Sequence, residues 1–128
     1  MACTLKIVAV NDVYLLDNWP RISTCRKQCA ASNQTIAVLP GDFISPSVLS
    51  SLDKGHGMID CMNKAGIDFV CIGNHENDLG FEAMCDRIRD SKFTWLNSNM
   101  PDMPLPKDIG TLPEYVIVEV QPQEEADD

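Results

Sequence analysis

Residues 68–76 read DFVCIGNHE, a short apolar run that leads straight into a cluster of polar and ionisable side chains. The same form occurs twice earlier in the chain, at residues 5–12 (LKIVAVND) and at residues 35–42 (TIAVLPGD). Short runs rich in β-branched residues are typical of buried strands. The three stretches therefore predict three strands, each followed by residues that can carry chemistry.

The segments between these runs have helical periodicity, so strands and helices alternate along the chain. The expected helices lie at about residues 20–30, 46–52, 58–65 and 81–88, and further strands are expected at residues 93–96 and 115–120. Ser45-Pro46 has the form of an N-cap followed by proline at the first helical position, and Gly55-His56-Gly57 is expected to break the chain between two helices. Strands separated by helices pair in parallel through right-handed crossovers. The sequence thus predicts an α/β fold with a mostly parallel sheet and flanking helices.

The chain has 128 residues, of which 45% are hydrophobic, enough for one domain with a buried core. Its apolar runs are much shorter than the roughly 20 residues that cross a bilayer. The N-terminus lacks the basic start and apolar middle of a secretory signal, which favours a cytoplasmic setting. Residues 121–128 (QPQEEADD) are acidic and have no apolar anchor, so we expect a disordered tail there.

The net charge of the chain argues against two classes of binding partner. Ten basic and nineteen acidic residues give a formal net charge of -9. Such a surface is unsuited to a nucleic-acid polymer or to an anionic membrane. A small phosphorylated ligand can still bind if cations reverse the potential at its site. The six cysteines lack the paired spacing of a zinc fold.

Groups that can bind metal follow each of the three strands: Asp12, Asp42, Asn74 and His75. Because ligands bind outside the carboxyl ends of parallel strands, these groups are expected at one edge of the sheet. Two carboxylates, an amide oxygen and an imidazole suit Mg²⁺, Mn²⁺ or Zn²⁺, and Asp42 can bridge two ions about 3.5–4 Å apart. Taken singly, Asp12 or Asp42 is more often a turn residue or a helix cap than a metal ligand. Their recurrence after all three strands favours a metal site.

The order of these motifs carries a family resemblance. Asn11-Asp12, Gly41-Asp42 and Gly73-Asn74-His75-Glu76 resemble the motifs of the calcineurin-like metallophosphoesterases. The continuation at residues 77–81 (NDLGF) and the later LNSN at residues 96–99 are similar to the 5′-nucleotidase and 2′,3′-cyclic phosphodiesterase branch. The resemblance covers about residues 5 to 120. It implies that residues 1–120 form the N-terminal half of an α/β/β/α sandwich.

The resemblance also implies roles for individual residues. Asp12 would bind the first of two divalent metal ions, Asp42 would bridge both, and Asn74 would bind the second. His75 would aid catalysis as a dyad with Asp78. The identity of the ions, Mn, Mg, Zn or similar, stays open. Glu76 has no catalytic role in this scheme and is expected to be structural, hydrogen-bonded near the turn.

Two positions depart from the family pattern. Tyr14 stands where most of the superfamily has a metal-binding histidine, so it is either a weaker metal ligand or an aromatic wall of the site. The family also supplies an isolated histidine and a Gly-His-x-His motif from later in the chain. This sequence contains only His56 and His75. The metal site is therefore expected to be incomplete in this chain.

The leading hypothesis is a metal-dependent phosphoester hydrolase of the nucleotidase type, with a nucleotide or another phosphate ester as substrate. The alternative is a non-catalytic, truncated remnant that keeps the fold as a binding or interaction domain. Half a sandwich leaves an exposed sheet edge, which is expected to invite pairing with another chain.

Overall fold

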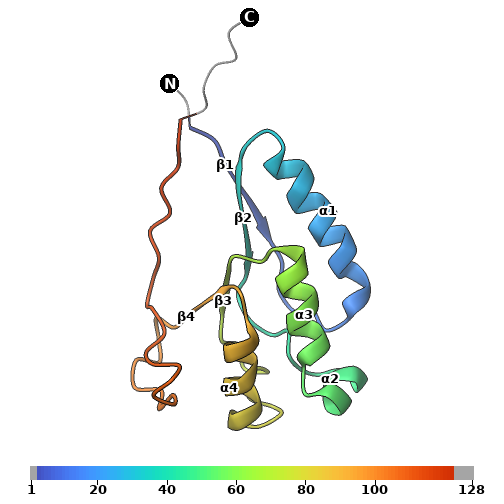
Figure 1. Cartoon of the computed structure of the whole chain (residues 1–128), viewed down its shortest axis with the longest axis vertical. Coiled ribbons are helices and arrows are strands. Elements are labelled where there is room, and N and C mark those ends of the chain that lie inside the picture. The colour runs from blue at the N-terminus through green and yellow to red at the C-terminus, as the bar shows by residue number, and fades with distance from the viewer. Residues whose placement is uncertain (1–2, 123–128) are drawn as a thin grey trace, which may run out of the picture.

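The structure, a computed structural model, describes residues 3–122. In this part of the chain one parallel sheet is formed in the order β1-β2-β3-β4 (Figure 1). The strands are β1 (Leu5–Ala9), β2 (Gln34–Leu39), β3 (Phe69–Cys71) and β4 (Thr94–Leu96). The α/β class predicted from the sequence is confirmed, with β3 and β4 slightly shorter than expected.

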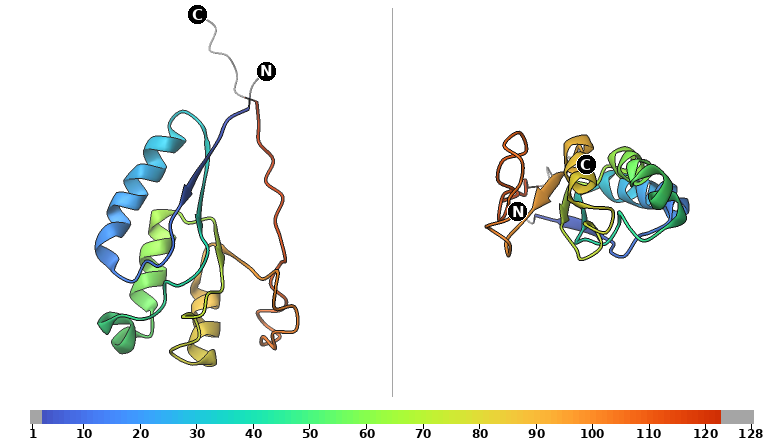
Figure 2. Two further views of the ribbon diagram at one scale, coloured as in Figure 1. Left: turned by 180° about the vertical axis from the view of Figure 1, so that it is seen from behind. Right: turned by 90° about the horizontal axis from the view of Figure 1, so that it is seen from below.

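The helices lie in a single layer on one face of this sheet (Figure 2). They are the short 3-10 helix η1 (Leu16–Asn18), α1 (Trp19–Ala30), α2 (Val48–Asp53), α3 (His56–Ala65) and α4 (Phe81–Asp90). Helix α1 packs on α3, and α3 packs on α4. Right-handed crossovers that always step in the same direction place every helix on the same side. In the described residues, the opposite face of the sheet has no helix over it.

The core lies between the sheet and this helix layer. The strand register aligns Leu39, Val70 and Trp95 in one row, and all three are at most 3% exposed. Met62 of α3 is also fully buried. Ile7 of β1 faces the other side and is 59% exposed. The face of the sheet that packs against the helices is therefore buried, and the opposite face is exposed at Ile7.

The prediction of a strand at residues 115–120 is wrong. Tyr115 and Ile117 are 71% and 80% exposed, and no strand is assigned after β4 in the part of the chain that the structure describes. The side chain of Gln34 donates to the carbonyl of Glu119 at 2.7 Å and accepts from the N–H of Gln121 at 3.0 Å. A strand exists only through a ladder of backbone hydrogen bonds, and here a side chain holds the segment instead.

The start of α2 also differs from the prediction. Its N-cap is Ser47, not Ser45. The hydroxyl of Ser47 accepts the N–H of Ser50 at 2.9 Å, and the hydroxyl of Ser50 accepts the N–H of Ser47 at 3.0 Å. This reciprocal capping box satisfies two groups that a start at Ser45 would leave unpaired. Helix α3 already begins at His56, so the break falls at Lys54 and Gly55, which have positive φ.

Ser47→Ala should lower the free energy of unfolding by about 1 kcal/mol, because it removes the cap of a short helix. Urea denaturation followed by circular dichroism measures this change. Ser51→Ala is the matched control, since the Ser51 hydroxyl donates to the carbonyl of Ser47 and takes no part in the capping box. We expect the control to stay within about 0.5 kcal/mol of the unsubstituted protein. An equal loss in both variants would show that the capping box is not the cause.

Two features of the sequence concern the ends and edges of the molecule. Most of the expected acidic tail, residues 123–128, lies outside the described residues. Strands β1 and β4 are the edges of the sheet in the described part, and pairing through such an edge stays a prediction.

Among residues 3–122, the helices are all too short or too polar to cross a membrane.

Candidate metal and catalytic site

Three loops meet at the carboxyl ends of β1, β2 and β3, at the lower edge of the sheet in Figure 1. The backbone N–H of His75 donates to Oδ1 of Asp42 at 3.0 Å, which joins the second loop to the third. The ring of Tyr14 lies edge-on to the imidazole of His75, with the ring centroids 5.9 Å apart, which joins the first loop to the third. The expected convergence of the three loops is therefore present in the fold.

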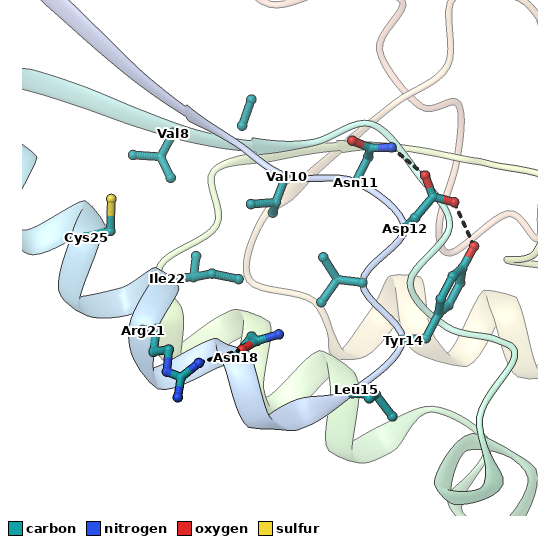
Figure 3. Close-up of a pocket in the computed structure, with 12 residues that line it drawn as sticks. Val8, Val10, Asn11, Asp12, Tyr14, Leu15, Asn18, Arg21, Ile22 and Cys25 are labelled. Carbon is teal, nitrogen blue, oxygen red and sulfur yellow. Dashed lines mark hydrogen bonds between the residues drawn. The ribbon is translucent and has the colours of Figure 1, made fainter.

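The first loop presents Asp12 at the end of a groove between the edge of β1 and helix α1, with a volume of about 840 Å³ (Figure 3). The Asp12 carboxylate is exposed and accepts hydrogen bonds from the amide of Asn11 and, at 2.8 Å, from the hydroxyl of Tyr14. Partial burial, together with the neighbouring Asp12 carboxylate, raises the pKa of Tyr14 to about 12. At neutral pH and without a bound metal, the Tyr14 phenol therefore keeps its proton and donates a hydrogen bond to Asp12.

The second and third loops touch through their backbones. A Cβ at Gly41 would lie 2.8 Å from Cα of Gly73, and a Cβ at Gly73 would overlap Oδ1 of Asp42. Only glycine fits at both positions. Asp42 itself has φ +62°, a left-handed conformation that aspartate tolerates better than most residues. The close approach of the two loops therefore requires glycine at positions 41 and 73.

His75 and Asp78 form the dyad that the resemblance implied. Nδ1 of His75 lies 2.7 Å from Oδ2 of Asp78, and the two side chains are 34% and 40% exposed. The hydrogen bond to Asp78 raises the pKa of His75 above its ordinary value of 6.5, against a smaller opposing effect of burial. Because Nδ1 is engaged by Asp78, Nε2 is the ring nitrogen that can face a ligand.

Asp78→Asn should lower the pKa of His75, because it removes the negative partner of the imidazolium. NMR titration of the His75 ring protons, with chelator present, measures the midpoint. In the unsubstituted protein the stabilisation of the charged ring is fully present below pH 6.5 and is lost as the pH rises through the higher folded pKa. The ring of His56, next to Asp90, is the internal reference. An unchanged His75 midpoint would contradict the role of Asp78.

Asn74 occupies a separate position. It is exposed and lines a different hollow of about 390 Å³ on the α4 side, together with Asn77 and Asn99. Contacts link Asp12 and Asp42 through Tyr14 and His75, whereas the hollow that Asn74 lines includes none of these four residues. Within residues 3–122, no three or more His, Cys, Asp and Glu side chains are grouped so that they could hold a metal ion.

The donor set fits a divalent ion in part. Asp12, Asp42 and Asn74 offer hard oxygen atoms, which suit Mg²⁺ or Mn²⁺. Catalytic metal sites usually have about three protein ligands for each ion. Three donors for two ions fall short of this number, even if Tyr14 lost its proton. Metal binding by these residues therefore stays a prediction.

Known proteins resemble the chain in sequence and in structure. A 2′,3′-cyclic-nucleotide 2′-phosphodiesterase/3′-nucleotidase of Haemophilus influenzae is 27% identical over 119 residues, which cover 75% of this chain and 18% of that protein. The snake venom 5′-nucleotidase of Naja atra is 30% identical over 104 residues, covering 78% and 20%. This chain belongs to the 5′-nucleotidase and 2′,3′-cyclic phosphodiesterase family. No protein-family model matches it.

The fold of the family agrees with the structure. The solved NAD nucleotidase of Haemophilus influenzae superimposes with a TM-score of 0.66 at 20% sequence identity, covering 77% of this chain and 21% of that one. The chain spans about a fifth of the length of the curated relatives that it matches. Those relatives are hydrolases of nucleotide phosphoesters, which places the chain in a hydrolase family.

Proposed function

We propose that this chain supplies the catalytic loops of a metal-dependent hydrolase that dephosphorylates nucleotides. The single observation that supports this most is the junction of the loops, where the N–H of His75 donates to Asp42 at 3.0 Å. This hydrogen bond holds the dyad of His75 and Asp78 beside the carboxylate of Asp42, which is suited to bridge two ions.

In this proposal Asp12, Asp42 and Asn74 hold two divalent cations such as Mn²⁺, Mg²⁺ or Zn²⁺. When bound, such ions activate water and neutralise the charge on phosphoryl oxygens. The chain's own acid is His75, whose Nε2 proton would stabilise the departing oxygen while Asp78 holds the ring. The negative charge of the chain makes cations a condition for binding an anionic nucleotide.

A second candidate function is a non-catalytic domain that binds or interacts through the same fold. The hydrogen bond from Tyr14 to Asp12 favours it, because the hydroxyl occupies an oxygen that a metal would need. The two candidates differ in metal binding. A catalytic centre must bind a divalent ion at Asp12 and Asp42, and an interaction domain need not.

The chain alone should be a very poor phosphatase that binds at most one divalent ion weakly, because two ions would share only three clear ligands. Titration with Mn²⁺, followed by electron paramagnetic resonance of the free ion, measures this binding. Release of phosphate from nucleoside monophosphates and from an aryl phosphate measures turnover. Two tightly bound ions with ordinary turnover would contradict this expectation and would require further ligands.

The function itself is tested in a fusion, in which this chain replaces the aligned segment of the Haemophilus influenzae phosphodiesterase/3′-nucleotidase. We expect the fusion to hydrolyse nucleotide phosphoesters only when a divalent ion is present. A folded fusion that binds no metal and has no activity, beside an active unsubstituted relative, would favour the non-catalytic candidate.

A further inference from the structure

Glu76 lies between the two loops that carry Asp42 and His75, and it has no part in the proposed chemistry. Its side chain is completely buried. Oε1 accepts the N–H of Phe43 at 2.8 Å and the N–H of Ile44 at 3.3 Å. Oε2 accepts the N–H of Asp42 at 2.9 Å and the N–H of Gly73 at 2.5 Å. One carboxylate therefore binds the backbones of both loops.

These four backbone N–H groups stabilise the buried carboxylate of Glu76, as a paired cation otherwise would. A buried carboxylate is costly unless it is paired or fully hydrogen-bonded. The ion pairs found among residues 3–122 do not involve Glu76, so the four N–H groups are what balances its charge. Conversely, without this acceptor the N–H groups would be left unsatisfied at a crowded junction. The carboxylate and the two loops thus depend on each other.

The hydrogen bond to Asp42 bears directly on the metal ligand. Asp42 has φ +62°, and a non-glycine residue keeps such a conformation only where its surroundings impose it. Glu76 fixes the N–H of Asp42, while the N–H of His75 fixes its Oδ1. The position of the Asp42 carboxylate is therefore determined from both ends by the same four-residue motif.

We propose that Glu76 is a positioning residue that clamps the loops after β2 and β3 together and so holds the Asp42 carboxylate in place for a metal ion. The second half of this statement rests on the proposed function. The first half concerns the chain itself and can be tested without metal. A merely structural carboxylate would stabilise the whole fold, whereas a clamp acts on these two loops.

Glu76→Gln in the full chain is the main variant, since it keeps the shape and replaces one acceptor oxygen by an amide donor. Asp68→Asn is the matched control. The Asp68 carboxylate also accepts a backbone N–H, that of Ala37 at 2.7 Å, and contacts Arg26 at 3.2 Å, away from the site. Glu76→Asp keeps the charge but is one methylene shorter, and serves if the glutamine variant does not fold.

Amide hydrogen exchange measured by NMR reports on the clamp. In either Glu76 variant, exchange at Phe43 and at Gly73 should become faster by about tenfold or more, while amides within β2 change little. In the Asp68 variant, the two loops should keep their protection. Equal acceleration throughout the sheet, or acceleration in one loop alone, would overturn the clamp.

Binding of Mn²⁺ to the same proteins reports on Asp42. We expect the Glu76 variants to bind Mn²⁺ about tenfold more weakly than the unsubstituted chain, and the Asp68 variant to bind it equally well. Equal affinity in the Glu76 variants and the unsubstituted chain would overturn the positioning role. If the unsubstituted chain binds no Mn²⁺, the same comparison is made in the fusion with the Haemophilus influenzae relative, where absence of metal binding would overturn the proposed function. The exchange experiment still decides whether Glu76 joins the loops.

Discussion

Asp42→Asn should abolish metal-dependent hydrolysis in the fusion with the Haemophilus influenzae relative, with a loss of about 10³-fold or more in kcat. The substitution is close to isosteric. Oδ1 of asparagine can still accept the N–H of His75, and asparagine tolerates the positive φ at this position as well as aspartate does. Only the negative charge is lost, and a ligand shared between two cations needs that charge to bind them both.

Metal content distinguishes this effect from a loss of folding. The Asp42 variant should bind less of both ions, measured by elemental analysis after gel filtration, while its circular dichroism stays unchanged. Asp60→Asn is the matched control, because Asp60 is an exposed carboxylate on α3 that pairs with Lys64. The control should retain activity and metal. A fully active, metal-loaded Asp42 variant would remove Asp42 from the site.

Much of this arrangement could be predicted from the sequence, because it follows from local patterns. The apolar runs at residues 5–10 and 35–39 predict strands, and alternation with helices predicts parallel pairing. Parallel pairing in turn predicts that Asp12, Asp42 and His75 follow the strands at one edge. Each step uses residues that are close in sequence.

The absent strand and the burial of Glu76 have a common physical cause, which is dependence on distant partners. Residues 115–120 have strand-like composition, but a strand needs a neighbour, and composition does not say whether one is present. The burial of Glu76 depends on the backbone of a loop more than thirty residues away. Such contacts leave no periodic signal in the sequence.

Turnover and metal binding should separate at His75. His75→Asn in the fusion should lower kcat by about 10²–10⁴-fold, the range for loss of a general acid or an electrostatic stabiliser. Metal content should be unchanged, because His75 contacts Asp42 through its backbone N–H, which the substitution keeps. Asp78→Asn should lower kcat less and should shift the alkaline limb of activity to lower pH, since it lowers the pKa of His75 and leaves the ring in place.

The matched control for this separation is His56→Asn. His56 is the other histidine of the chain, its side chain is 63% exposed, and it lies beside Asp90 away from the three loops. Its substitution should leave kcat, metal content and the pH profile unchanged. Equal loss of metal in the Asp42 and His75 variants would contradict the division of roles. It would mean that the imidazole is itself a ligand, and that the acid must be sought elsewhere in the complete site.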